Sequence, residues 1–210
     1  MGLTSWYEAK IMPRLITCAC SQGQVMKRRA AIVPRARGDV FELGCGGGIN
    51  HAFYDAAAIT SYAGIDPHAG LLDDARSAAR SKGWPADLRQ GRGEAIPFAD
   101  ASFDCVVCTF TLCSVDDAPA VMREMRRVLR PGGTVLFLEH GRAPDAGVRR
   151  WQQRIEPVWS RLAGGCHLTR PIASALEGSG FAVESLGAGY TPKAPRFAGW
   201  MEWGIAHKRA

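Results

Sequence analysis

The sequence has 210 residues, of which 47% are hydrophobic and 22% are charged, and 26 Lys and Arg residues against 20 Asp and Glu residues give a net charge of +6. These proportions exclude a disordered, a collagen-like and a coiled-coil chain, and the length predicts one domain with short additions. The basic excess lies in short runs such as residues 27–29, which are typical of solvated helix ends, so we predict no nucleic-acid partner.

Apolar segments alternate with helical patterns along the chain. The first 38 residues favour helix, with a break at Met12-Pro13, and predict a lid (residues 1–38) before a main domain (residues 39–210). The expected strands are 40–43, 62–65, 87–90, 103–108, 134–139, 182–187 and 199–207. The expected helices are 49–58, 70–81, 118–129, 143–162 and 170–178, with Asp116 and Thr169 as N-caps of the third and the last. Such alternation implies parallel crossovers, so the sequence predicts an α/β fold, a doubly wound sheet with helices on both faces.

The cysteines and the lack of long apolar runs bear on location. Seven cysteines without regular spacing are typical of free thiols in a reducing compartment. No segment approaches the ~18 apolar residues of a membrane span, and no signal peptide is evident. We therefore expect a cytoplasmic protein with at most weak contact with a membrane surface. Cys105-Val-Val-Cys108 has the spacing of a metal pair, but residues three apart on a strand point to opposite faces, so we predict no metal site.

A glycine-rich turn follows the first expected strand. Gly44, Gly46 and Gly48 permit a tight turn and the close approach of a ligand, and the next helix presents unpaired N–H groups, which together predict a nucleotide-like ligand. A dinucleotide fingerprint needs glycine at position 49, which is Ile, and Glu42 suits a cationic ligand better than a pyrophosphate. Both features disfavour a nicotinamide-dependent oxidoreductase.

A carboxylate ends the second expected strand. Asp66, followed by Pro67, stands about 20 residues after the glycine turn, where an acidic side chain can accept hydrogen bonds from both hydroxyls of a ribose. Two further motifs follow in order, at residues 91–98 and at residues 100–104. The sequence therefore predicts a nucleoside-containing ligand at the carboxyl edge of the sheet.

Together these motifs resemble those of the class I S-adenosylmethionine-dependent methyltransferases, in the small-molecule branch that includes the ubiquinone-biosynthesis methyltransferases. The resemblance spans residues 40–139. It implies S-adenosylmethionine as cofactor and a Rossmann-like, seven-stranded, mostly parallel sheet with an antiparallel last strand. The implied cofactor contacts are Glu42, Gly44, Cys45 and Gly46 at the methionine part, Asp66 and Pro67 at the ribose, Gly93, Glu94 and Ala95 at the adenine, and Cys108 and Thr109 on the floor. Arg92 stands where many relatives carry Asp, so backbone contacts are expected to replace a side-chain contact there.

A narrower resemblance is to the methyltransferase-like alkyl thiol S-methyltransferases. It is carried by residues 107–115, 137–140, 151–153, 157–159 and 165–170. It implies a small, rather apolar acceptor that is most often a thiol, with a phospholipid head-group amine or a hydroxyl as alternatives. Those relatives carry an apolar N-terminal anchor that residues 1–38 lack, so no membrane attachment is expected. A non-catalytic protein that only binds the cofactor is a further alternative.

The end of the fifth expected strand supplies the candidate catalytic groups. His140, with Glu139 beside it, lies at the carboxyl edge where ligands bind in such sheets, and is our first candidate to deprotonate or orient the acceptor. His167 and Arg170 are expected to bind the acceptor and to lower the pKa of its thiol. The remaining predicted acceptor contacts are Cys113 and Tyr7.

Overall fold

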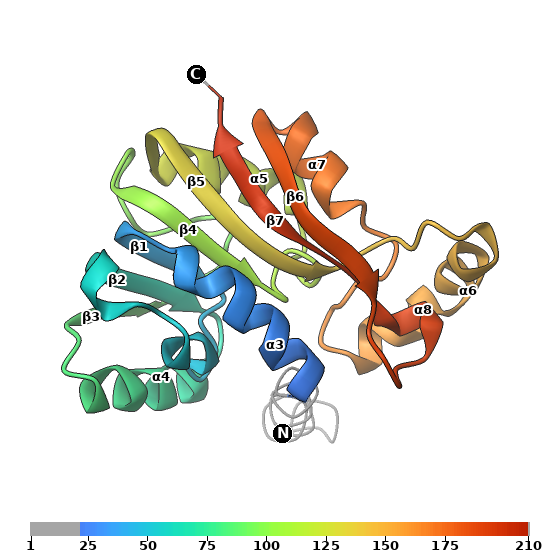
Figure 1. Cartoon of the computed structure of the whole chain (residues 1–210), viewed down its shortest axis with the longest axis horizontal. Coiled ribbons are helices and arrows are strands. Elements are labelled where there is room, and N and C mark those ends of the chain that lie inside the picture. The colour runs from blue at the N-terminus through green and yellow to red at the C-terminus, as the bar shows by residue number, and fades with distance from the viewer. Residues whose placement is uncertain (1–21, 210) are drawn as a thin grey trace.

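A single seven-stranded sheet forms the centre of the molecule. The structure, a computed structural model, describes residues 22–209. The strands are β1 (Gly38–Leu43), β2 (Ile59–Asp66), β3 (Ala86–Gln90), β4 (Phe103–Thr109), β5 (Leu129–His140), β6 (Phe181–Tyr190) and β7 (Trp200–Lys208). Their order is β3-β2-β1-β4-β5-β7-β6, and β7 pairs antiparallel with both β5 and β6, whereas the other pairs are parallel (Figure 1). The predicted fold, with its antiparallel last strand, is confirmed.

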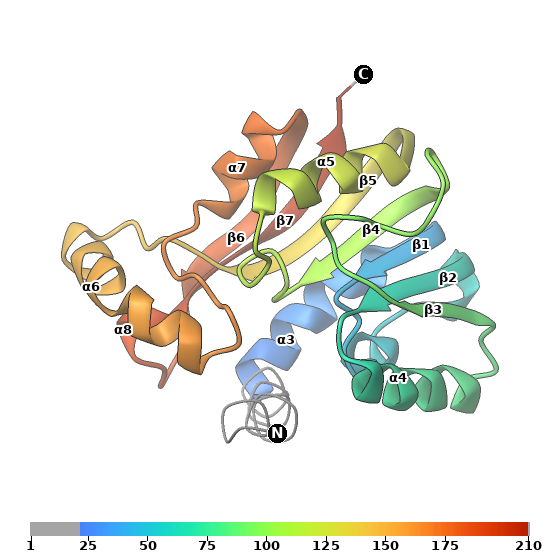
Figure 2. The ribbon, with the colours of Figure 1, turned by 180° about the vertical axis from the view of Figure 1, so that it is seen from behind.

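Helices cover both faces of this sheet. The described helices are α3 (Gly23–Ile32), α4 (Ala69–Ser81), α5 (Ala118–Val128), α6 (Ala146–Leu162), α7 (Ile172–Gly178) and α8 (Arg196–Gly199), with 3-10 turns at Val33–Arg35, Ile49–Ala52 and Ala56–Ala58. Helices α5 and α7 bury their apolar side chains on one face, and α3 and α4 do so on the other (Figures 1 and 2). None of these described helices combines the length and the apolar character needed to cross a membrane.

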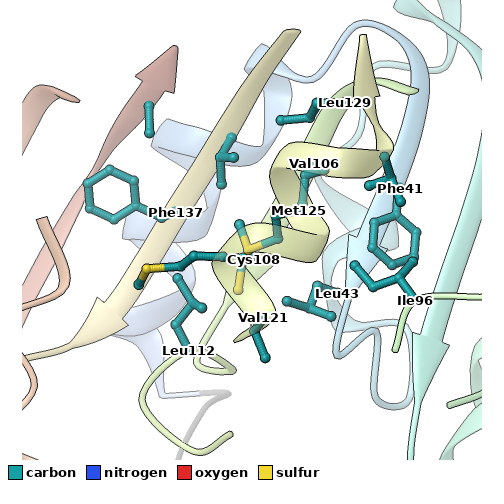
Figure 3. Close-up of a cluster of buried hydrophobic side chains, with 14 of the residues drawn as sticks. Phe41, Leu43, Ile96, Val106, Cys108, Leu112, Val121, Met125, Leu129 and Phe137 are labelled. Atoms are coloured by element: carbon teal, nitrogen blue, oxygen red, sulfur yellow. The ribbon is translucent and has the colours of Figure 1, made fainter. Parts of the chain in front are cut away.

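The alternation of side chains along each strand builds two separate cores. Phe41, Val106 and Phe137 point to the α5 face, where they pack with Val121 and Met125 of that helix (Figure 3). Their strand neighbours point to the α3 face, because successive side chains on a strand alternate. The same alternation puts Cys105 in one core and Cys108 in the other, as predicted for this pair.

The described part of the predicted lid packs on the sheet. Val25 and Ile32 of α3 are buried in the core on that face. Arg29 of the same helix is only 4% exposed, so the interpretation of residues 27–29 as a solvated helix end is wrong for this arginine. Residues 1–21, with the predicted acceptor contact Tyr7, lie outside the described residues.

Three local predictions are wrong. The expected helix over 49–58 is two 3-10 turns, because Gly48 at its start is left-handed (φ 78°) and the polar side chains of Asn50 and His51 turn inward. Asp117, not Asp116, caps α5 by accepting a hydrogen bond from the backbone N–H of Ala120. Helix α7 has no side-chain cap, since Thr169 donates its hydroxyl to a glutamate instead.

The core around Phe41 yields a stability prediction. Its ring is fully buried, and its centroid lies 5.2 Å from that of Phe103 and 5.5 Å from that of Phe98. Replacing Phe41 by Ala is expected to lower the free energy of unfolding by about 3–5 kcal/mol, because it removes apolar burial and leaves a cavity. Urea denaturation measures this change. Val158→Ala, at a position 60% exposed, is the control and is expected to change the same quantity by less than about 0.5 kcal/mol; equal effects of the two substitutions would contradict the described core.

Candidate active site

A cavity of about 720 Å³ opens at the carboxyl ends of β1, β2 and β4. It is lined by the glycine turn after β1 (44–47), the end of β2 (66–68), the loop after β3 (91–94) and the loop after β4 (109–111). Ser160, Arg161, Gly164 and Gly165, at and after the end of α6, line it as well. Parallel strands whose carboxyl ends meet at one edge therefore place the glycine turn, Asp66, part of the motif at residues 91–98 and the expected floor residue Thr109 around one space.

The glycine turn is tied to the neighbouring strand. The backbone N–H groups of Gly44 and Cys45 donate to the carbonyl oxygen of Ile65 (2.9 and 3.0 Å), and the N–H of Gly46 donates to the Asp66 carboxylate (2.9 Å). Gly44 has φ 71°, and a Cβ there would collide with the Thr111 side chain, so glycine is required by both conformation and space. The turn is thus a narrow, braced backbone surface that a ligand can approach closely.

Asp66 lines the cavity and is 6% exposed. One carboxylate oxygen accepts the Gly46 N–H, and the other accepts the His68 N–H at 2.9 Å. Oδ2 keeps a second lone pair for a ligand hydroxyl, and Oδ1 can accept from another when the His68 ring, whose Nδ1 lies 3.3 Å from it, turns away into solvent. The His68 ring lies 3.3 Å from the same carboxylate, and this hydrogen bond raises the pKa of His68.

A second carboxylate, Glu42, is buried at the inner end of the cavity. It accepts hydrogen bonds from the hydroxyls of Tyr54 and Tyr62 (both 2.7 Å) and from the amide of Asn50 (2.9 Å). Burial raises the pKa of Glu42, while the two tyrosines, the Asn50 amide and the nearby charge of Arg29 oppose the rise. These donors supply what a buried carboxylate requires.

Arg29 brings a positive charge from α3 to this end of the cavity. Its guanidinium donates to Asn50 Oδ1 (2.6 Å) and to Thr109 Oγ1 (2.8 Å), and its Cζ lies 5.0 Å from the centre of the Phe110 ring. Sequence reasoning missed Arg29, because nothing near residue 29 in the sequence shows that α3 reaches the end of β4. A basic residue on the apolar face of a helix is the signal that points to such a buried contact.

The residues expected at an adenine follow β3 in the chain, and two of the three line the cavity. Gly93 and Glu94 line it, whereas Ala95 does not. Glu94 accepts the backbone N–H groups of Asp116 and Asp117 (3.1 and 3.2 Å), so its carboxylate holds the start of α5 in place. Arg92 pairs with the Asp116 carboxylate at 2.8 Å, so its side chain is directed to that aspartate.

Glu139 holds the loop that follows β4. Its fully buried carboxylate accepts the backbone N–H groups of Thr111, Leu112 and Cys113 at 2.9–3.1 Å, and Cys108 Sγ lies 3.3 Å from it. Burial raises the pKa of Glu139, and the three N–H donors oppose that rise. Neither Glu139 nor Cys108 is among the described residues that line the cavity, whereas Thr109, the other residue expected on the floor, does line it. Glu139 is therefore a positioning residue in this structure.

Arg170 supports the same loop from the other side. Its guanidinium donates to the carbonyl oxygens of Leu112 and Val115, both at 2.6 Å. Its predicted contact with an acceptor is not seen, because the cavity lining does not include it among the described residues. Arg161, which does line the cavity, is the cation that sequence reasoning missed there.

The other predicted acceptor residues lie behind the cavity wall. His167 bonds the Glu156 carboxylate through its ring (3.1 Å) and the carbonyl oxygen of Cys113 through its backbone N–H (2.7 Å). His140 is half-buried, and its Nδ1 lies 3.8 Å from the sulfur of Cys166. A hydrogen bond from Cys113 and the neighbouring His140 hold the pKa of Cys166 well below its usual range, whereas the pKa of Cys113 is raised.

Comparison with known proteins identifies the family. A family described as "Methyltransferase domain" matches residues 41–137. Human thiol S-methyltransferase TMT1A is 33% identical over 195 residues, which cover 86% of this chain and 79% of that protein. The chain belongs to the S-adenosylmethionine-dependent methyltransferase family. The family that its motifs predicted is confirmed, and with it S-adenosylmethionine as the cofactor.

Other relatives and a solved structure are similar to this methyltransferase domain over different shares of the chain. Human thiol S-methyltransferase TMT1B is 37% identical over 144 residues, or 68% of this chain, and the chain spans 59% of that relative's length. The ubiquinone/menaquinone biosynthesis C-methyltransferase UbiE of Hahella chejuensis is 43% identical over 76 residues, 35% of this chain and 30% of that protein. A solved SAM-dependent methyltransferase from Methanosarcina mazei shares the fold, with a TM-score of 0.67, 21% identity, and coverage of 83% of this chain and 94% of that one.

The cavity of the methyltransferase domain fits S-adenosylmethionine. At Gly44 the Thr111 side chain fills the space of a side chain, whereas a Cβ at Gly46 would meet nothing within 4 Å, so the backbone at Gly46 is open to the close approach of a ligand. Arg29 and Glu42, which lie close together in the lining, bring opposite charges, as the carboxylate and ammonium of an amino acid require, and Asp66 offers acceptor capacity for a ribose. We propose these three side chains, with the backbone of residues 44–46, as the main cofactor contacts.

Asp66 provides the first test of this site. Asp66→Ala is expected to weaken the binding of S-adenosylhomocysteine by about 100-fold or more, since two hydrogen bonds to a charged acceptor, each worth ~1.5–3 kcal/mol, are lost. Isothermal titration calorimetry measures the affinity. Asp73→Ala is the matched control, because this aspartate is exposed and pairs only with Arg76 on the surface of α4. An unchanged affinity in Asp66→Ala would remove the ribose assignment.

His68 provides a test that depends on pH. Because Asp66 raises the pKa of His68 above its unfolded value, the pair contributes stability in full below about pH 6.5, and the contribution disappears as the pH rises through the folded pKa. The side chain is 55% exposed, so the contribution is expected to stay below about 1 kcal/mol. The melting temperature of the wild type should exceed that of His68→Gln at about pH 5.5 and match it at about pH 9. A difference that grows with pH would contradict the assigned pair.

Proposed function

We propose that this methyltransferase transfers a methyl group to the sulfur of a small, rather apolar thiol. The observation that carries the proposal is the similarity to human thiol S-methyltransferase TMT1A, which extends over 79% of that protein. The identity therefore reaches beyond the cofactor motifs, since the methyltransferase-domain match ends at residue 137. It includes the segments after β5 that contribute Arg161 and Gly165 to the far wall of the cavity.

The chemistry needs little acid–base machinery from the protein. Bound S-adenosylmethionine supplies a methyl group on a positively charged sulfur. When the methyl group is transferred, that sulfur leaves as the neutral thioether of S-adenosylhomocysteine. The protein has to align an acceptor with that methyl group and to exclude water. A thiol with a pKa near ~8.5 has a usable thiolate fraction at neutral pH. This agrees with a cavity whose lining contains neither His140 nor His167 among the described residues.

The walls beyond the cofactor contacts suit such an acceptor. Phe110 lines the cavity, and its backbone is held at φ 59°, a conformation that is uncommon outside glycine and that collects at functional sites. Arg161 brings a positive charge to the opposite wall, where it favours the thiolate form of an acceptor. We therefore assign Phe110 to acceptor contact and Arg161 to the lowering of its pKa.

The proposed compartment is the cytoplasm. The described cysteines 45, 105, 108, 113 and 166 are all free thiols, which is the state that cysteines keep in a reducing environment. A cytoplasmic location stays a prediction, and fractionation of cells that express the full chain tests it.

A matched panel of acceptors tests the proposed reaction. Purified protein receives S-adenosylmethionine and one of three compounds that share an apolar skeleton and carry a thiol, an amine or a hydroxyl. We expect S-adenosylhomocysteine to form about tenfold or more faster with the thiol than with the other two, equal to a difference of at least ~1.4 kcal/mol in activation free energy. Asp66→Ala is the control for a contaminating enzyme, because it should remove the product. Preference for the amine or the hydroxyl would replace the thiol, and no turnover with any of them would contradict the proposal.

A further inference from the structure

Three metal-ligating side chains meet behind the cavity wall. The sulfurs of Cys113 and Cys166 and one ring nitrogen of His140 all lie within 4.8 Å of one another, and His140 Nδ1 is 3.8 Å from Cys166 Sγ. They come from distant parts of the chain: the loop after β4, the end of β5 and the connection between α6 and α7. None of them is needed for the cofactor contacts described above.

The spacing of these atoms is close to that of a zinc site. Tetrahedral zinc holds sulfur at ~2.3 Å and nitrogen at ~2.0–2.1 Å, which places neighbouring ligand atoms roughly 3.5–3.8 Å apart. The distance between Cys166 and His140 already falls at that value, and the remaining separations are at most 4.8 Å. A rotation of a single cysteine side chain that moves its sulfur by at most about one ångström is enough to bring the ligand atoms to the spacing of a zinc site.

We propose that Cys113, His140 and Cys166 form a binding site for a soft divalent cation, zinc in the first place. Two thiolates and an imidazole are a ligand set that favours zinc over magnesium or calcium. On binding, the two thiols lose their protons to solvent and His140 binds as the neutral ring. Three protein ligands leave one position of the tetrahedron for a water or another external ligand.

The surroundings hold the ligands in place without a metal. Cys113 is fixed through its backbone, because Glu139 accepts its N–H (3.0 Å) and the N–H of His167 donates to its carbonyl oxygen (2.7 Å). The two sulfurs lie in a small apolar cluster with Leu168, packed against Trp159. A site whose supporting contacts already exist binds a metal at a lower ordering cost.

The position of the site suggests what a bound metal does. Ser114 and Gly165, each next to one of the cysteines, both line the cavity. The two backbones approach closely there, since a Cβ on Gly165 (φ 83°) would lie 2.8 Å from the Ser114 carbonyl oxygen. A metal bound by Cys113 and Cys166 would therefore clamp the loop after β4 to the segment after α6, and so fix the far wall of the cavity.

The proposal departs from the expectation of no metal site. That expectation rested on Cys105 and Cys108, whose side chains point to opposite faces of the sheet. The ligands proposed here are 27 and 26 positions apart in the chain, going from 113 to 140 and from 140 to 166. No short motif joins them, and the topology of the sheet alone brings them together.

Cobalt titration tests the site directly. Full-length protein, reduced and freed of metal with a chelator, is titrated with Co²⁺ and followed by absorption spectroscopy. We expect one Co²⁺ per chain, with the charge-transfer absorption of thiolate ligands and the intense visible bands of tetrahedral cobalt, and displacement of both by Zn²⁺. Zinc is also expected to raise the melting temperature of the wild type, because it binds the folded state preferentially.

Single substitutions tie the signal to these three residues. Cys166→Ser is expected to remove the charge-transfer band. His140→Ala, at a half-buried position, is expected to weaken binding by about tenfold or more, equal to at least ~1.4 kcal/mol. Cys105→Ser and His167→Ala are the matched controls, since they remove a cysteine and a histidine outside the cluster. Circular dichroism confirms that each variant is folded, and His140→Ala decides the outcome if Cys166→Ser is not.

Three results would overturn the proposal. These are the absence of stoichiometric cobalt binding, a cobalt spectrum that is unchanged in both Cys166→Ser and His140→Ala, and a Cys113–Cys166 disulfide in place of metal in protein purified without reductant. The readout is a spectrum and a melting temperature, so it does not depend on the identity of the methyl acceptor.

Discussion

Buried carboxylates at the ends of parallel strands organise this molecule. Glu42 on β1, Asp66 on β2 and Glu139 on β5 are each at most 6% exposed, and a carboxylate in such a place needs hydrogen-bond donors. The donors are side chains that pack beneath the cavity for Glu42, and backbone N–H groups of adjoining loops for the other two. Satisfying three buried charges therefore fixes the loops that form the cavity.

The parts of the site that the sequence could predict are those that local patterns determine. The strands, the glycine turn and Asp66 are local patterns, since each is set by the residues beside it, and their positions agree with the structure to within a few residues. Arg29 and Arg161 reach the cavity through tertiary packing; for Arg29 the local sequence shows no more than that it shares the apolar face of its helix with Val25 and Ile32. Tertiary packing also decides where His167 and Arg170 lie: their side chains bond a neighbouring glutamate and two loop carbonyls, and neither residue is among the described residues that line the cavity.

The cysteines show the same limit more sharply. The close sequence spacing of Cys105 and Cys108 suggests a pair, yet the strand separates their side chains into different cores. Cys113 and Cys166 are far apart in the sequence and form no motif, yet they share one small cluster with His140. Spacing is informative for cysteines in turns and helices, but on strands the alternation of side chains decides.

The order of the strands has a consequence for how the chain is made. Strand β6 leaves the ribosome before β7, but it joins the sheet only through β7, which lies between it and β5. Until β7 has emerged, β5 is an open edge and β6 has no partner strand, even though the β1–β5 part that surrounds the cavity is already complete in sequence. Unpaired strand edges invite association with other chains, so the nascent chain is exposed to aggregation until β7 has emerged.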